Sequence, residues 1–89
     1  MPASSEVQIA LPAKIALHAR PAGQFVKTAS QFQAQVRISV DGKAVDAKSI
    51  LAVLALGAQG GTVLTLSAEG DDAQAALTAL AACVSGLVE

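Results

Sequence analysis

The chain contains few of the residues from which most catalytic and metal sites are built. Its 89 residues include one cysteine, one histidine, no tryptophan and no tyrosine. A single cysteine cannot form an internal disulfide, and one histidine with one cysteine is too few for an ordinary zinc site. We also find no nucleophile–base–orienter triad. We therefore expect no metal and no cofactor, and the missing disulfides indicate a cytoplasmic protein in which Cys83 is a buried, unreactive side chain.

Charged residues and long apolar runs are also scarce. Charged residues make up 15% of the chain, the net charge is −1, and Lys and Arg do not cluster. Nucleic-acid binding depends on phosphate neutralisation and often on aromatic stacking, so this composition argues against it. We find neither an apolar run that could span a bilayer nor a signal-peptide pattern, and expect no membrane insertion. Gly57, Gly60 and Gly61 match no nucleotide-binding fingerprint, because no Lys-Ser or Lys-Thr follows them.

The apolar residues that are present, 53% of the chain, are arranged with two periodicities. Strict alternation is typical of half-buried strands and predicts four of them. They are expected over residues 6–11, 36–41, 43–46 and 62–69. Asp41-Gly42 is a strong β-hairpin signal, since both residue types accept positive φ. Residues 1–5 are expected to be frayed, and a single domain fills residues 1–89.

Spacings of three and four residues predict three helices. The first runs from Ala19 to Gln33, the second from Ser49 to Leu56, and the third from an N-cap at Asp71 to Leu87. Pro21 suits a first turn, where N–H groups have no intrahelical acceptor. The order is β-α-β-β-α-β-α, and alternating strands leave one face of the sheet in water. We therefore predict an α+β open-faced sandwich, a four-stranded antiparallel sheet with three helices on one face.

The most informative segment is Leu17-His18-Ala19-Arg20-Pro21-Ala22, where the first predicted helix begins. Free backbone N–H groups at a helix start favour an anion. A neutral imidazole can act as a nucleophile, and the guanidinium of Arg20 offers paired donors to phosphate oxygens. These residues indicate phosphoryl transfer through a ring nitrogen of His18, a reaction that depends mostly on positioning and electrostatics. The plainer alternatives are a capping or surface histidine and a solvated arginine.

A second informative segment is the short helix predicted after Lys48. Ser49 is most simply its N-cap. Large apolar residues surround barely two turns, so that some must face water: Ile50, Leu51, Val53, Leu54 and Leu56. An exposed apolar patch on a small domain often marks a docking surface. The alternative is a helix that the rest of the chain covers well.

From about Glu6 to its C-terminus, the chain resembles the histidine-containing phosphocarrier (HPr) family of the bacterial phosphoenolpyruvate-dependent sugar phosphotransferase system. The resemblance rests on Leu17–Ala22 with Phe25-Val26, on Asp41-Gly42-Lys43, on Lys48-Ser49-Ile50, on Leu56-Gly57 and on Ala68-Glu69-Gly70-Asp71. It implies the same β-α-β-β-α-β-α sandwich, and a carrier with a transient phosphohistidine rather than a stand-alone catalyst. Ala13 and Ala16 replace the family's usual Asn and Gly, and the loop from Pro12 to Leu17 is slightly longer.

The resemblance also implies roles for individual residues. His18 would receive the phosphoryl group on its δ1 nitrogen from enzyme I and give it to sugar-specific IIA domains, with Arg20 assisting. Both partners would dock on one face formed by Ala19, Ala22, Gly23, Ile50, Leu51 and Leu54. Ser49 would be the regulatory serine, modified in some bacteria by a dedicated kinase/phosphorylase, and a phosphate there would weaken docking. We further expect a monomer.

Three other functions remain open. A regulatory module of the same fold would present phosphorylated Ser49 to a transcriptional regulator, but relatives of that kind lack the active histidine, so His18 favours the carrier. A carrier of the same kind could serve nitrogen regulation instead of sugar uptake. A small α+β domain that binds nucleic acid or another protein is the third, and the missing basic stripe disfavours nucleic acid.

Overall fold

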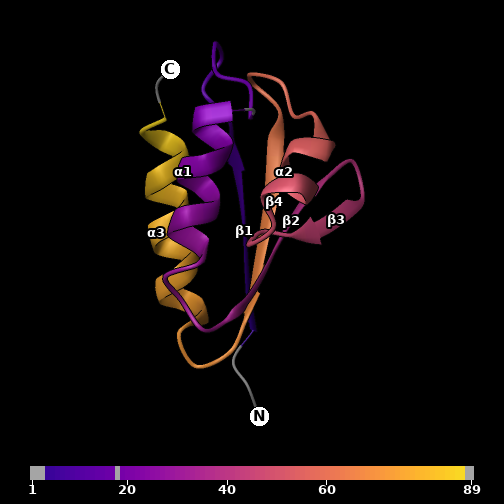
Figure 1. The fold of residues 1–89 in the computed structure, drawn as a ribbon. Coiled ribbons are helices and arrows are strands. Elements are labelled where there is room, and N and C mark those ends of the chain that lie inside the picture. The colour runs from indigo at the N-terminus through magenta and orange to yellow at the C-terminus, as the bar shows by residue number, and fades with distance from the viewer. Residues whose placement is uncertain (1–3, 18, 88–89) are drawn as a thin grey trace.

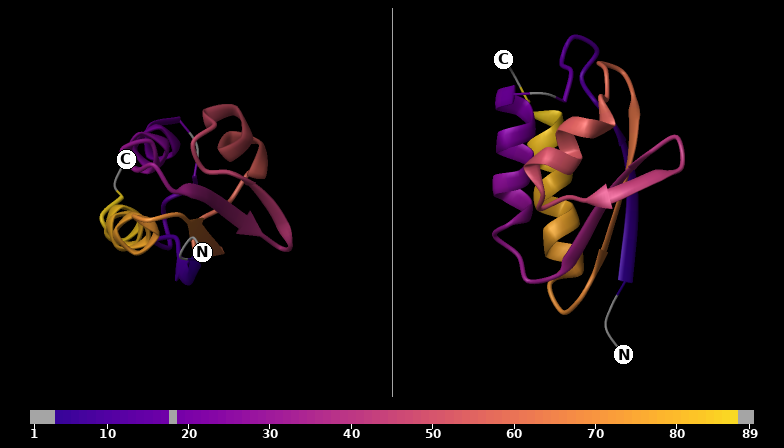
Figure 2. Two further views of the ribbon diagram at one scale, coloured as in Figure 1. Left: turned by 90° about the horizontal axis from the view of Figure 1, so that it is seen from below. Right: turned by 45° about the vertical axis from the view of Figure 1, so that its right-hand side comes forward.

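The computed structural model describes residues 4–17 and 19–87. Four strands form one sheet: β1 (Ser4–Ala10), β2 (Gln35–Val40), β3 (Lys43–Asp46) and β4 (Val63–Glu69). Their order is β1-β4-β2-β3, and every neighbouring pair is antiparallel. Helices α1 (Ala19–Ala29), α2 (Ile50–Leu56) and α3 (Ala73–Ser85) lie on one face of this sheet, with α1 and α3 side by side (Figures 1 and 2). The predicted fold and order of elements are confirmed.

Strand alternation decides which side chains enter the core. Leu64, Leu66 and Ala68 of β4 are buried, whereas the residues between them remain partly or fully exposed. The helices add small side chains to this layer, and Phe25 of α1 is the largest fully buried residue. Each large aliphatic side chain buried in this way contributes roughly 1.5–3 kcal/mol. Within the described residues, no helix combines the length and apolar character needed to cross a membrane.

The turns and caps follow the local residue types. Asp41 and Gly42 have φ values of 51° and 83° and join β2 to β3, as predicted for a two-residue hairpin loop. Ser49 precedes α2 with φ −105° and ψ 111°, and its Oγ accepts a hydrogen bond from the Ala52 N–H at 3.3 Å. Gly57 ends the same helix with φ 61°. The hairpin and the N-cap role of Ser49 are confirmed.

The start of β1 differs from the prediction. Residues 1–5 were expected to be frayed, but Ser4 and Ser5 belong to β1 and pair with Glu69 and Ala68 of β4. The prediction is therefore wrong for these two serines, and residues 1–3 lie outside the described residues. The partner strand is about sixty positions away in the sequence, so no local pattern reveals the pairing.

The first helix ends at Ala29, before the predicted end at Gln33. Beyond it, the Phe32 carbonyl accepts a hydrogen bond from Lys48 Nζ at 2.6 Å. The N–H groups of Gln33 and Ala34 donate to the Asp72 carboxylate at 2.9 and 2.7 Å. These hydrogen bonds to distant residues take the place of those that a longer helix would make. The apolar spacing that includes Phe32 gives no sign of them.

The ends of the last helix also differ from the prediction. Asp72 rather than Asp71 occupies the N-cap position of α3, and its side chain makes no capping hydrogen bond there. The carboxylate instead accepts hydrogen bonds from the segment before β2. At the other end, α3 stops at Ser85, and Leu87 is buried beyond the helix. Long-range contacts therefore override the local capping preference.

These hydrogen bonds make the stability of the protein depend on pH through Asp72. The Gln33 N–H, followed by the Ala34 N–H and the nearby Lys48 ammonium, lowers the pKa of the Asp72 carboxyl below its ordinary value, against the opposing effect of desolvation. A carboxyl whose pKa is lower in the folded state stabilises the fold above its unfolded-state pKa, and this contribution is lost as the pH falls through the folded-state pKa.

We expect Asp72→Asn to lower the urea midpoint at about pH 7, and the difference from the parent protein to be smaller at about pH 2.5, because protonation of the parent carboxyl increases as the pH falls. Urea unfolding at both pH values measures this. Asp71→Asn is the matched control, because Asp71 is an exposed neighbour of the same charge. A midpoint difference of the same size at both pH values would contradict the role of the Asp72 charge.

Candidate functional site

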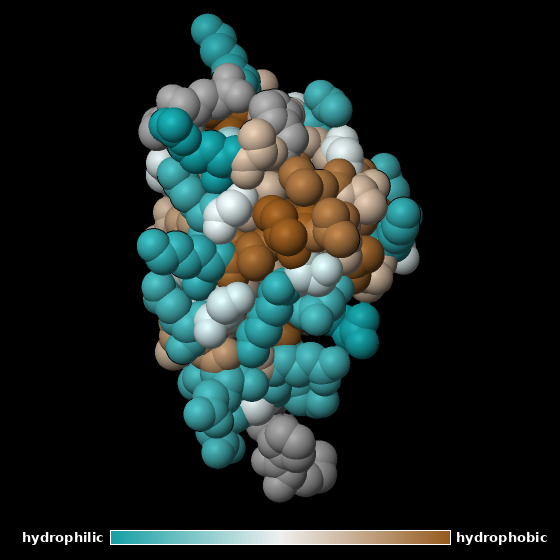
Figure 3. Space-filling model, in the orientation of Figure 1, coloured by the Kyte–Doolittle hydropathy of each residue, from teal (hydrophilic) through white to brown (hydrophobic). Residues whose placement is uncertain are grey.

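Helix α2 presents a group of apolar side chains to solvent. Ile50, Leu51 and Leu54 are 39%, 78% and 37% exposed, whereas Val53 is fully buried. We call these three exposed residues the α2 patch. Figure 3 shows it as a continuous apolar area over α2, bordered by hydrophilic side chains. The sequence left open whether this helix is well covered, and the structure shows that it is not.

The start of α1 also presents residues to solvent. Ala19, Arg20 and Gly23 are exposed, and α1 packs directly against α2. Ala19 has a φ of 40°, an uncommon value for a residue other than glycine, where the chain enters the helix. Pro21 is fully buried in the first turn, as its position in the sequence suggested.

Ala22 was expected on the docking face, but its side chain is fully buried, so its methyl group belongs to the core. The correction follows from helix geometry: Ala22 shares the inward stripe of α1 with Phe25 and Ala29, three and seven positions later. His18 lies outside the described residues.

The segment that leads to the first helix is held at both ends by the loop between α2 and β4. Near its start, the Leu11 N–H donates to the Thr62 carbonyl at 2.9 Å, and the Gly61 N–H donates to the Leu11 carbonyl at 3.1 Å. At its end, the Leu17 N–H donates to the Ala58 carbonyl at 2.8 Å. Leu11 and Leu17 are themselves buried. The residue before His18 is therefore anchored by both a hydrogen bond and apolar packing.

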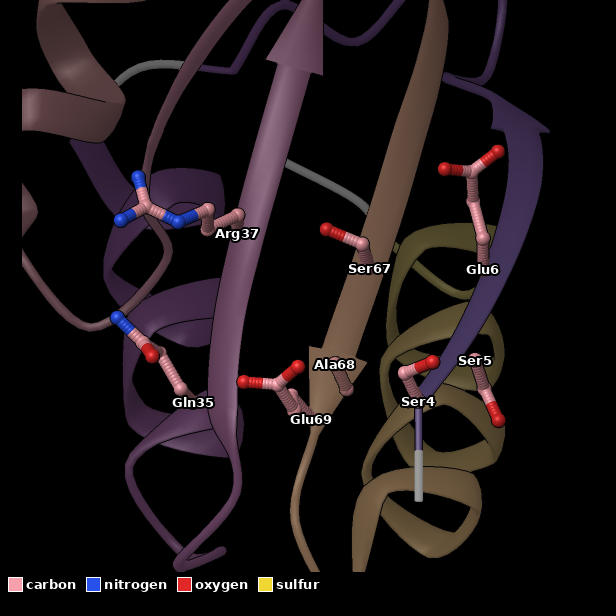
Figure 4. Close-up of a pocket in the computed structure, with 8 residues that line it drawn as sticks. All are labelled: Ser4, Ser5, Glu6, Gln35, Arg37, Ser67, Ala68 and Glu69. Atoms are coloured by element: carbon pink, nitrogen blue, oxygen red, sulfur yellow. The ribbon is translucent and has the colours of Figure 1, made fainter. Parts of the chain in front are cut away.

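A polar hollow of about 350 Å³ lies elsewhere, on the open face of the sheet (Figure 4). It is lined by Ser4, Ser5, Glu6, Gln35, Arg37, Ser67, Ala68 and Glu69. The Arg37 side chain extends away from Glu6, so the charged groups do not converge on one point (Figure 4). None of the lining residues belongs to the predicted site.

The cysteine also plays no part in this region. Cys83 lies on α3 and packs against the core with its side chain partly exposed. The sequence predicted a buried small side chain, and the structure places it at the margin of the core instead. It lies on a different helix from the α2 patch.

Comparisons with known proteins point to one family. A family model described as "PTS HPr component phosphorylation site" matches residues 4–85. Phosphocarrier protein HPr of Vibrio cholerae serotype O1 is 43% identical over 82 residues, covering 92% of this chain and 96% of that protein. The crystal structure of a phosphocarrier protein HPr from Bacillus anthracis superposes with a TM-score of 0.88 at 43% identity, covering 92% and 98% of the two chains. The structure of Crh from Bacillus subtilis, described as a domain-swapped, intertwined dimer, gives a TM-score of 0.75 at 43% identity, with coverage of 91% and 93%.

Proposed function

Because this chain belongs to the HPr family of phosphocarrier proteins of the phosphotransferase system (PTS), we propose that the phosphoryl group it carries is bound to His18. The proposal rests on the position of this histidine in the sequence and on the structure of the residues on either side of it. In the sequence, the single histidine of the chain stands between Leu17, which is buried and hydrogen-bonded to Ala58, and Ala19 and Arg20, the exposed first two residues of α1. It is therefore next in sequence to a fixed segment on one side and to solvent-accessible residues on the other.

The chemistry is a transfer of PO₃ between proteins. A neutral ring nitrogen of His18 attacks phosphorus, and the donor's bond to phosphorus breaks as the new N–P bond forms. The oxygens of the phosphoryl group carry the negative charge during transfer, and the exposed guanidinium of Arg20 is positioned in sequence to neutralise part of it. In the second half of the cycle an acceptor takes the group and His18 is regenerated. The protein is thus a carrier and not a stand-alone catalyst.

We assign docking of both donor and acceptor to one face, because both must reach the same nitrogen. This face consists of the α2 patch with Ala19 and Gly23, the exposed members of the set predicted from the sequence. Its apolar character suits association by burial of surface. The partners that fit are enzyme I as donor and IIA domains as acceptors, in either the sugar or the nitrogen branch, and the carrier acts as a cytoplasmic monomer.

The test is to label the protein from radioactive phosphoenolpyruvate with enzyme I and to locate the label after trypsin digestion at alkaline pH. Cleavage after Lys14 and Lys27, with the Arg20–Pro21 bond intact, releases residues 15–27. This peptide contains His18 but no Ser, Thr, Tyr, Asp, Glu or Cys. We expect acid-labile label on it. Label confined to the peptide that begins at Ser49 would refute the assignment to His18.

Ser49 supports a second, regulatory function, favoured by the similarity to Crh and by the position of this serine beside the α2 patch. We expect Ser49→Asp to lower the kcat/KM of phosphorylation by enzyme I about fivefold, since a charge enters the docking face at a cost of about 1 kcal/mol. Ser49→Asn is the matched control, because Asp and Asn cap helices equally well and differ only in charge. Steady-state kinetics with enzyme I measure the effect, and equal rates for the Asp and Asn variants would count against regulation by charge.

A further inference from the structure

Gly60, in the loop between α2 and β4, differs from the other glycines of that loop. We propose that Gly60 is a positioning residue for phosphoryl transfer. Its missing side chain leaves the space in which residues 12–17, which we call the approach segment, rest against this loop directly before His18. The inference depends on the proposed function, because it concerns how the same histidine is held.

The contact is between backbone atoms. A Cβ atom added at Gly60 would lie 2.2 Å from the Ala13 carbonyl oxygen, 2.8 Å from the Ala13 carbonyl carbon and 3.1 Å from the Pro12 carbonyl oxygen. The first two distances are shorter than any real contact of a Cβ atom. No side-chain rotation can relieve the overlap, since only backbone is involved. Any residue other than glycine at position 60 must therefore displace the approach segment.

The approach segment cannot move away as a whole. Its neighbour Leu11 is hydrogen-bonded in both directions, to Thr62 and Gly61, and Leu17 is hydrogen-bonded to Ala58. A turn inside the segment is closed by the Ile15 N–H, which donates to the Pro12 carbonyl at 3.0 Å. With both ends held, a displacement of Ala13 must change the backbone conformation between residues 12 and 16, and this change alters the direction in which the chain enters Leu17, the residue bonded to His18. Displacements of about 1 Å at a reacting group can reduce a rate by roughly 10²-fold.

Position 60 requires glycine because there is no room for a side chain, and not because of its backbone conformation. Gly57 and Gly61 have φ values of 61° and 83°, and an added Cβ atom would meet nothing within 4 Å at either position. Glycine is favoured there because it adopts positive φ without strain. Gly60 lies outside the positive-φ region, and only the contact with the approach segment excludes a side chain. Gly60→Ala therefore tests the contact without adding strain from the backbone conformation.

The experiment compares wild type, Gly60→Ala and the control Gly86→Ala, where an added Cβ would meet its nearest neighbour at an ordinary 3.4 Å. We expect Gly60→Ala to lower the kcat for phosphorylation by enzyme I roughly tenfold or more, while KM changes less than about twofold because the α2 patch is intact. The amide NMR signals of Leu17 and Ala19 should shift in this variant. Gly86→Ala should match wild type in all three readouts.

A second substitution tests whether the contact itself is responsible. Ala13→Gly in the Gly60→Ala background gives the peptide after residue 13 the freedom to turn its carbonyl away, and we expect most of the lost kcat to return. Should Gly60→Ala alone fail to fold, this double variant serves instead, and it must fold with a kcat within about threefold of wild type. A merely destabilising role predicts instead that the kcat of folded Gly60→Ala is unchanged, because relief of the overlap would restore stability as well.

The outcomes separate this inference from the proposed function. If wild type carries label on the His18 peptide and Gly60→Ala has an unchanged kcat, or a raised KM with an unchanged kcat, the positioning role of Gly60 is overturned and the carrier function stands. A rescue that fails in a folded double variant also overturns it. If wild type takes no label on residues 15–27, the assignment to His18 and the role of Gly60 are both wrong.

Discussion

Replacing His18 with alanine is expected to abolish acceptance of the phosphoryl group from enzyme I. Alanine has no nucleophilic nitrogen, and no second histidine exists in the chain to take its place. Loss of the nucleophile itself removes the covalent step, so the rate should fall by at least roughly 10³-fold, to the background of the assay. The measurement is transfer of label from phosphoenolpyruvate through enzyme I to the variant.

The fold should be unaffected by this substitution, and urea unfolding of His18→Ala checks that point. Lys27→Ala is a suitable control, since Lys27 is an exposed cation in the last turn of the same helix, α1. This control should accept label at close to the wild-type rate. Acid-labile label on a folded His18→Ala protein would show that another residue is the carrier, and the assignment of the phosphoryl group to His18 would then have to be abandoned.

The second large effect is expected from Leu51→Asp in the α2 patch. Leu51 is 78% exposed, so the fold loses little when its side chain is replaced. In a complex with enzyme I the leucine would be buried, and a carboxylate in its place would be left without a partner. Truncation of a central apolar contact typically costs about 2 kcal/mol, which corresponds to a roughly 30-fold increase in KM. Steady-state kinetics at varied carrier concentration separate this from any change in kcat.

Val63→Asp provides the matched control for this experiment. Val63 is also a large apolar residue with 54% exposure, but it lies on β4 rather than on α2. The same change of side-chain chemistry there should leave the KM for enzyme I within about twofold of wild type. Equal KM values for the Leu51 and Val63 variants would indicate that docking does not use the α2 patch.

The secondary structure follows from the sequence because it depends on local preferences that the chain repeats consistently. Alternation along β4 and the three- and four-residue spacing along α3 each present one apolar face. Asp41-Gly42 and Ser49 act through atoms within a few residues of themselves, so both were predictable. The exposure of the α2 patch was predictable only in part: many large apolar residues surround a short helix, but the sequence left open whether the rest of the chain covers them.

Features that depend on distant parts of the chain were not predictable in this way. The end of α1 is decided by Lys48 and Asp72, and the pairing of Ser4 and Ser5 is decided by β4. Ala22 was assigned to a docking face by resemblance, but its direction is decided by the packing of α1 on the core. Alanine is compatible with either environment, so its residue type alone carries no signal.

The sequence by itself determined which residues are available for chemistry, since one histidine, one neighbouring arginine and one apolar helix leave few choices. It also determined the type and order of the seven elements. Only the tertiary structure decided which of the proposed docking residues face solvent, and that Gly60 lies against the backbone before His18. The physical reason is the range of the interactions: periodicity and capping act over a few residues, whereas contacts between loops some forty-five positions apart exist only after the sheet and helices have packed.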